Sequence, residues 1–100
     1  MKVQLVTFSG CPNAAAARAV LERVLSSSGI HAAIEEVDTT APETPEALRG
    51  WGSPTILIDG VDIEGQETPN SASCRLYRDS AGRLRSAPPE ATLRAALART

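Results

Sequence analysis

The chain begins with a short apolar run, which is followed by an amphipathic segment and then by a second apolar run. This order of segments constrains the fold more strongly than any other feature of the sequence. Val3–Phe8 is apolar and rich in β-branched residues, as in a buried strand. Pro12–Ser28 repeats apolar side chains at the spacing of one helix face, and Ala32–Val37 predicts a second strand. Two strands that are joined through a helix lie parallel, with a right-handed crossover. The opening segment therefore predicts a β-α-β unit.

Shorter elements are expected in the second half of the chain. Thr44 is predicted to cap a one-turn helix that ends at Arg49, because threonine is a good N-cap and Pro45 suits a first helical turn. Asp59-Gly60 separates two β-rich runs, and Asp-Gly in that position is a strong signal for a β-hairpin. The two runs are Thr55–Ile58 and Val61–Ile63.

The last third of the chain predicts two further strands and a final helix. These elements are expected at Cys74–Arg78, Arg83–Arg85 and Pro89–Arg99. Strands joined by tight turns should be antiparallel, so the sheet combines parallel and antiparallel pairs. The sequence therefore predicts one α/β domain over residues 1–100, with a mixed sheet of four to five strands flanked by three helices.

Composition and charge narrow the classes of partner. The chain has 100 residues and a formal net charge of -2, whereas nucleic-acid-binding domains are usually basic. No apolar run reaches the roughly 20 residues of a membrane helix, and the N-terminus lacks the apolar region of a signal peptide. Phosphate-loop, dinucleotide and zinc motifs are absent from the sequence. We expect a cytoplasmic protein with no nucleic-acid or membrane partner and no cofactor.

Cys11 is the residue with the clearest chemical signal. It follows the first strand and precedes the most regular helix pattern, so we expect it at the helix N-cap with Pro12 in the first turn. The thiolate would then face the backbone N–H groups of Asn13 and Ala14, an environment that makes a sulfur nucleophilic or metal-binding. The alternative is a small buried cysteine near a helix start.

Two segments of the chain resemble the thioredoxin-like superfamily in its glutaredoxin-sized form. They are Thr7–Pro12 and Gly52–Gly60, and the resemblance covers about residues 1–63 and the final helix. It implies that the Ser53–Pro54 bond is cis and that Pro54 packs against Cys11. It also implies that the backbone of Ser53 pairs with an extended, thiol-bearing substrate. Trp51 is then either a lid on that substrate or a large packing residue.

The chain departs from dithiol oxidoreductases at Ala14, where a resolving cysteine would stand. Cys11 could form mixed disulfides alone or pair with Cys74. The strand that carries Cys74 is expected beside the Thr55–Ile58 strand, which would allow the two sulfurs to meet. A cysteine in a half-buried strand is otherwise a small apolar residue.

The tail of the chain also resembles the end of alkylmercury (organomercurial) lyases. The matching segments are Cys74–Tyr77 and Ala87–Glu90. In those enzymes two separated cysteines bind mercury and an aspartate relays a proton, but Ala14 stands at the place of that aspartate. The resemblance implies a soft-metal site at Cys11 and Cys74 that binds without turnover.

Three functional hypotheses therefore stand side by side. The first is thiol–disulfide exchange through Cys11 with a small molecule or a protein that carries a thiol or disulfide. The residues expected to contact this substrate are Pro12, Trp51, Ser53 and Pro54. The second is binding of a soft metal ion by Cys11 and Cys74. The third is a redox-inert adaptor that uses the fold as a scaffold.

Overall fold

The β-α-β unit predicted at the start of the chain is present. A computed structural model describes residues 1–66 and 75–99. In it, β1 (Val3–Thr7), α1 (Ala14–Ser27) and β2 (Ile34–Asp38) follow one another, and β1 and β2 are parallel. The bounds differ from the prediction by two residues or fewer.

The main sheet is extended by a hairpin on the other side of β1. β3 (Thr55–Ile58) runs antiparallel to β1 and to β4 (Val61–Asp62), so the strand order is β2-β1-β3-β4. The turn at Asp59 and Gly60 has positive φ values of 51° and 82°, as the Asp-Gly pair predicts. Among the described residues this is a mixed sheet of four strands.

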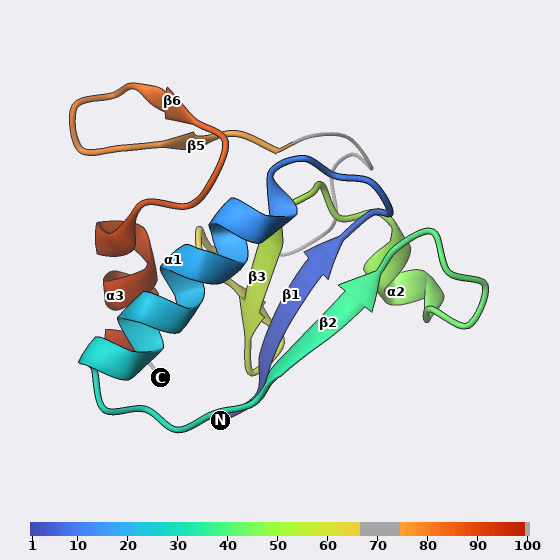
Figure 1. Cartoon of the computed structure of the whole chain (residues 1–100), viewed down its shortest axis with the longest axis horizontal. Helices are drawn as coiled ribbons and strands as arrows, with labels where there is room; N and C mark the ends of the chain where they lie inside the picture. The colour runs from blue at the N-terminus through green and yellow to red at the C-terminus, as the bar shows by residue number, and fades with distance from the viewer. Residues whose placement is uncertain (67–74, 100) are drawn as a thin grey trace.

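A second hairpin lies outside the main sheet. β5 (Tyr77–Arg78) and β6 (Leu84–Arg85) pair only with each other in the part of the chain that is described (Figure 1). Tyr77 and Arg78 of the predicted strand Cys74–Arg78 therefore do not pair with β3, whereas Arg75 bonds the Ser53 carbonyl just before β3 and Cys74 lies outside the described residues. The reason is that both edges of β3 are already paired, with β1 and with β4.

Helices cover the main sheet unequally. α1 and α3 (Glu90–Ala98) lie together on one face, whereas α2 (Glu46–Arg49) is a single turn beyond β2 (Figure 1). Pro45, and not Thr44, is the N-cap of α2, because the Thr44 hydroxyl donates to the backbone carbonyl of Asp38 instead. No helix in residues 1–66 and 75–99 has the length and apolar character needed to cross a membrane.

The alternation of side chains along β1 and β3 divides the core between the two faces. Val3, Leu5 and the isoleucines of β3 point toward α1 and α3. Val6 and Leu57 point the other way and meet Trp51 and Val37. The face under α2 is therefore closed mainly by one large aromatic side chain rather than by a long helix.

β2 is one edge of the main sheet, and its outward residues are acidic. Glu35 and Glu36 are exposed, and only Val37 in this strand is buried. Arg18 of α1 bonds Glu36 at 2.9 Å and Glu22 at 2.7 Å. The strand keeps its register through its pairing with β1 and turns charged side chains toward solvent.

Candidate functional site

Cys11 lies in a turn between β1 and α1. Its N–H donates to the Phe8 carbonyl at 3.2 Å, and its own carbonyl accepts the N–H of Ala14 at 3.3 Å. The helix N-cap is Asn13, so the prediction of Cys11 as the N-cap, with Pro12 in the first turn, is wrong. Two turns precede the helix, and the Ala14 amide is already bonded. One of the two amides expected to face the sulfur, that of Ala14, is thus taken by the Cys11 backbone.

The residue is nevertheless accessible in part. Cys11 is half-buried and is a free cysteine, and the neighbouring Pro12 is exposed. Gly10 has a φ of 81°, a left-handed conformation that favours glycine and allows the chain to turn sharply before the cysteine. The local sequence therefore presents a thiol at the surface end of β1.

The strand pairing brings a second loop to the same edge of the sheet. Val6 pairs with Thr55, so Pro54 follows opposite the end of β1. β2 is parallel to β1 and ends at the same edge, with Thr7 opposite Asp38. The turn that carries Cys11 and the loop that carries Pro54 thus lie at the same end of the sheet (Figure 1).

The Ser53–Pro54 loop is buried and tightly bonded. Its peptide bond is cis, as predicted. The carbonyl of Ser53 accepts the N–H of Arg75 at 2.7 Å, and the carbonyl of Pro54 accepts the hydroxyl of Tyr77 at 2.6 Å. The Ser53 side chain is completely buried, and its Oγ has no hydrogen-bond partner among the described residues. The backbone carbonyl expected to bind a substrate strand is already engaged within the chain.

Behind this loop lies a charged cluster that the sequence did not predict. The Arg75 guanidinium donates to both carboxylate oxygens of Asp62, at 2.7 and 2.8 Å, and to Glu64 at 2.9 Å. It also donates to the Thr55 hydroxyl at 3.0 Å. The Arg75 side chain is 9% exposed and that of Asp62 is 0% exposed. We call Arg75, Asp62, Glu64 and Thr55 the buried ion cluster.

Tyr77 links the buried ion cluster to the loop. The Arg75 guanidinium carbon lies 4.8 Å from the centre of the Tyr77 ring. Burial raises the pKa of the Tyr77 hydroxyl above its ordinary value, although the positive charge of Arg75 opposes the shift. The hydroxyl therefore stays protonated and remains a donor to the Pro54 carbonyl.

Trp51 does not lie over the thiol as a lid would. It is 5% exposed and packs with Val6, Val37 and Leu57 on the face of the sheet under α2. Its burial favours the packing interpretation.

Asp38 fixes the end of β2 beside the Cys11 turn. Its pKa lies below the ordinary value, first because the Thr40 hydroxyl donates to it at 2.6 Å, then through the Thr40 amide at 2.8 Å. Partial desolvation opposes this effect, and the backbone N–H of Ser9 adds to it. The carboxylate thereby ties β2 to the segment just before Cys11.

A pH dependence follows from this lowered pKa. At a pH above the ordinary aspartate pKa near 3.8, the Asp38 carboxylate contributes its full stabilisation to the folded state. This stabilisation is lost as the pH falls through the lower pKa that Asp38 has in the folded protein. We expect Asp38→Asn to be less stable than the wild type in urea at neutral pH, with the difference shrinking toward about pH 2. Substitution of the exposed Glu43 by Gln is the control. An unchanged difference at both pH values would contradict the prediction.

Cys74 lies outside the described residues, so the predicted pair with Cys11 remains a prediction. Within residues 1–66 and 75–99 no group of three or more His, Cys, Asp or Glu side chains is arranged to hold a metal ion.

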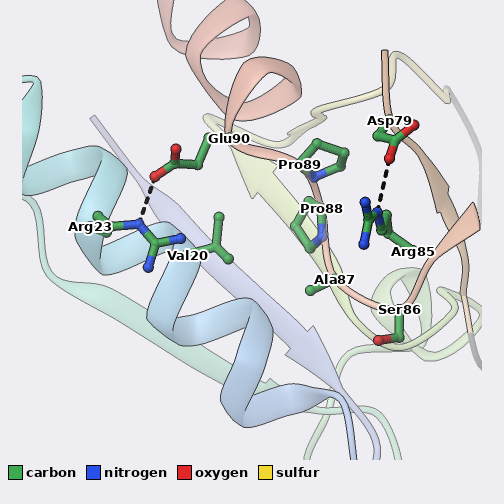
Figure 2. A pocket seen from close by; sticks show the side chains of 9 residues that line it. All are labelled: Val20, Arg23, Asp79, Arg85, Ser86, Ala87, Pro88, Pro89 and Glu90. Atoms are coloured by element: carbon green, nitrogen blue, oxygen red, sulfur yellow. Dashed lines mark hydrogen bonds and ion pairs between the residues drawn. The ribbon is translucent and has the colours of Figure 1, made fainter. Parts of the chain in front are cut away.

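A separate groove of about 380 Å³ lies between α1 and the segment that leads into α3 (Figure 2). Its lining is Val20, Arg23, Asp79, Arg85, Ser86, Ala87, Pro88, Pro89 and Glu90. Arg23 bonds Glu90 at 2.6 Å, and Arg85 bonds Asp79 at 2.9 Å. Both cations of the groove thus already hold a carboxylate, and Cys11 is not part of its lining.

Comparison with protein-family models, with curated protein sequences and with solved structures gave no match.

Proposed function

We propose that this chain is a thioredoxin-like domain that carries out thiol–disulfide exchange through Cys11. The proposal is supported by the order of the elements and by the strand order β2-β1-β3-β4. The observation that carries it is the placement of a half-buried residue with a free thiol and of the Ser53–Pro54 loop at the same end of the sheet. A nucleophile on a loop beside a rigid sheet is a common arrangement for chemistry.

The proposed reaction has two exchange steps. The Cys11 thiolate attacks one sulfur of a substrate disulfide, which forms a mixed disulfide and releases the other substrate sulfur as a thiolate. Ala14 stands where a local second cysteine would be, so the second thiol comes from a low-molecular-weight reductant or from Cys74. A low-molecular-weight thiol attacks the substrate sulfur of the mixed disulfide, regenerates the Cys11 thiolate and stays bonded to the substrate, so the net reaction replaces one thiol of the substrate disulfide by another. Cys74 instead attacks the Cys11 sulfur and releases the substrate as a thiolate, so the substrate disulfide is reduced and the two cysteines are oxidised to a Cys11–Cys74 disulfide.

The surrounding residues have supporting parts in this proposal. Pro12 follows Cys11 directly and is exposed, so it would contact a substrate. Pro54 would limit the space beside the sulfur, because the register of β1 and β3 leaves it at the same edge.

The test uses a small mixed disulfide, in which thionitrobenzoate is joined to a small thiol, as the substrate. The rate at which the protein releases thionitrobenzoate from this substrate is measured. Cys74 is a second thiol able to release thionitrobenzoate, so the comparison is made in a Cys74→Ser background. In that background we expect Cys11→Ser to slow the release at least about a hundredfold, because serine cannot replace a thiolate nucleophile. Cys74→Ser alone is the matched control and should keep the first step. Equal rates for Cys74→Ser and the variant with both serines would reject the proposal.

Soft-metal binding makes a different prediction in the same variants. If Cys11 and Cys74 form a metal site instead, Cys11→Ser and Cys74→Ser lose affinity for Hg²⁺ to a similar extent. Neither the wild type nor these variants then exchange disulfides. A redox-inert adaptor would show neither exchange nor tight Hg²⁺ binding.

A further inference from the structure

The Ser53 carbonyl is occupied by the chain itself. Arg75 donates its backbone N–H to this oxygen at 2.7 Å, and Tyr77 bonds the next carbonyl, that of Pro54, at 2.6 Å. An extended peptide that approaches a sheet edge binds by adding backbone hydrogen bonds of the strand type. A peptide that brings a disulfide to Cys11 along this edge would therefore compete with Arg75 for Ser53.

The segment Arg75–Tyr77 is held by its side chains as well as by its backbone hydrogen bond to Ser53. Its guanidinium lies in the buried ion cluster and bonds both oxygens of Asp62, which is itself completely buried. Removal of one ion from such a buried pair leaves the other without compensation, so the pair favours one arrangement of the segment. The ring of Tyr77 packs against the same guanidinium. The segment is thus anchored on β3 and β4.

We propose that Arg75–Tyr77 regulates access to Cys11 as an internal competitor for extended peptide substrates, with the Arg75–Asp62 ion pair as its latch. This inference rests on the proposed function. A small disulfide reaches Cys11 without needing the Ser53 carbonyl, whereas an extended peptide disulfide must first displace the Arg75 N–H. The domain in its latched form therefore discriminates against extended peptides.

The test compares two substrates with the same leaving group, both in a Cys74→Ser background. One is the thionitrobenzoate mixed disulfide of N-acetylcysteine, and the other is that of an extended peptide. The latch is removed by the double substitution Asp62→Leu and Arg75→Met, because replacing both ions leaves no unpaired charge. We expect the rate with the peptide, divided by the rate with the small substrate, to rise about tenfold. This is the effect expected when the peptide no longer has to displace roughly one hydrogen bond, that from the Arg75 N–H to the Ser53 carbonyl.

The matched control removes an exposed ion pair elsewhere. Arg23→Met with Glu90→Leu changes the same residue types in the pair between α1 and α3, at 2.6 Å, and should leave the ratio unchanged. Hydrogen exchange supplies a second measurement. The Arg75 amide should be protected in the starting protein and lose protection in the latch variant, while the amides of β1 and β3 stay protected.

The failures of the two proposals are distinguishable. A ratio that stays constant in a latch variant with intact protection of β1 and β3 overturns the internal competitor and leaves exchange through Cys11 standing. A protected Arg75 amide in that variant overturns the role of the ion pair as the latch. Absence of exchange with both substrates overturns the proposed function and this inference with it.

Discussion

Asp62→Ala is expected to lower the free energy of unfolding by about 3–5 kcal/mol, because it leaves a buried guanidinium without its carboxylate. Asp62 is 0% exposed and is bonded at both oxygens by Arg75. It also accepts the backbone N–H groups of Glu64 and Gln66, at 3.1 and 3.2 Å. Small domains are stable by only about 5–15 kcal/mol, so the loss removes a large part of the total.

Urea denaturation of wild type and variant measures this effect. The control is Glu22→Ala, which breaks the exposed pair with Arg18 and should cost less than about 1 kcal/mol. The double variant Asp62→Leu with Arg75→Met should recover most of the loss, since no isolated charge remains. A loss in Asp62→Ala as small as that of the control would show that the pair does not stabilise the fold.

Trp51→Ala is the second large expected effect, with a loss of about 3–5 kcal/mol. Trp51 is 5% exposed and fills the face of the sheet that the single turn of α2 covers only in part. Deleting the indole leaves a cavity against Val6, Val37 and Leu57, and the β-strands cannot close it without losing their pairing.

Trp51→Phe is the matched variant, because it keeps an aromatic ring of smaller volume. Its loss in urea denaturation should be clearly smaller than that of Trp51→Ala. If Trp51 were a lid over a substrate, both variants would keep nearly wild-type stability and lose exchange activity instead. That result would overturn the packing interpretation.

The parts of the fold that could be predicted are those set by local chemistry. The β-α-β unit follows from the apolar periodicity of Val3–Phe8 and Pro12–Ser28. The β3–β4 hairpin follows from Asp59-Gly60, because these residues tolerate positive φ. The cis bond before Pro54 came from the resemblance and not from local propensity.

The exact start of α1 could not be predicted. Cys11, Pro12 and Asn13 each suit the beginning of a helix, so composition does not choose between them. The choice is made by hydrogen bonds that only the folded backbone defines, such as that from the Ala14 amide to the Cys11 carbonyl. Cys11 therefore lies in a turn, two residues before the helix cap.

The buried ion cluster could not be predicted for a different reason. Arg75 and Asp62 are 13 positions apart, and the sequence showed only an aspartate near a turn and one arginine among several. Only the structure shows that in β4 the apolar Val61 is 57% exposed and the charged Asp62 is buried, the reverse of ordinary strand polarity. The sequence carried no signal that distinguished this aspartate from one in a turn.

The acidic edge of the sheet bears on how copies of this domain behave at high concentration. An unpaired strand edge is a template onto which another molecule can add its own strand, the first step of fibril growth. On β2, Glu35 and Glu36 of one copy would face those of the next if the strands joined in register. Repulsion between these carboxylates opposes self-association along this edge, although Arg18 compensates part of the charge of Glu36, and neutralising both carboxylates would remove that opposition.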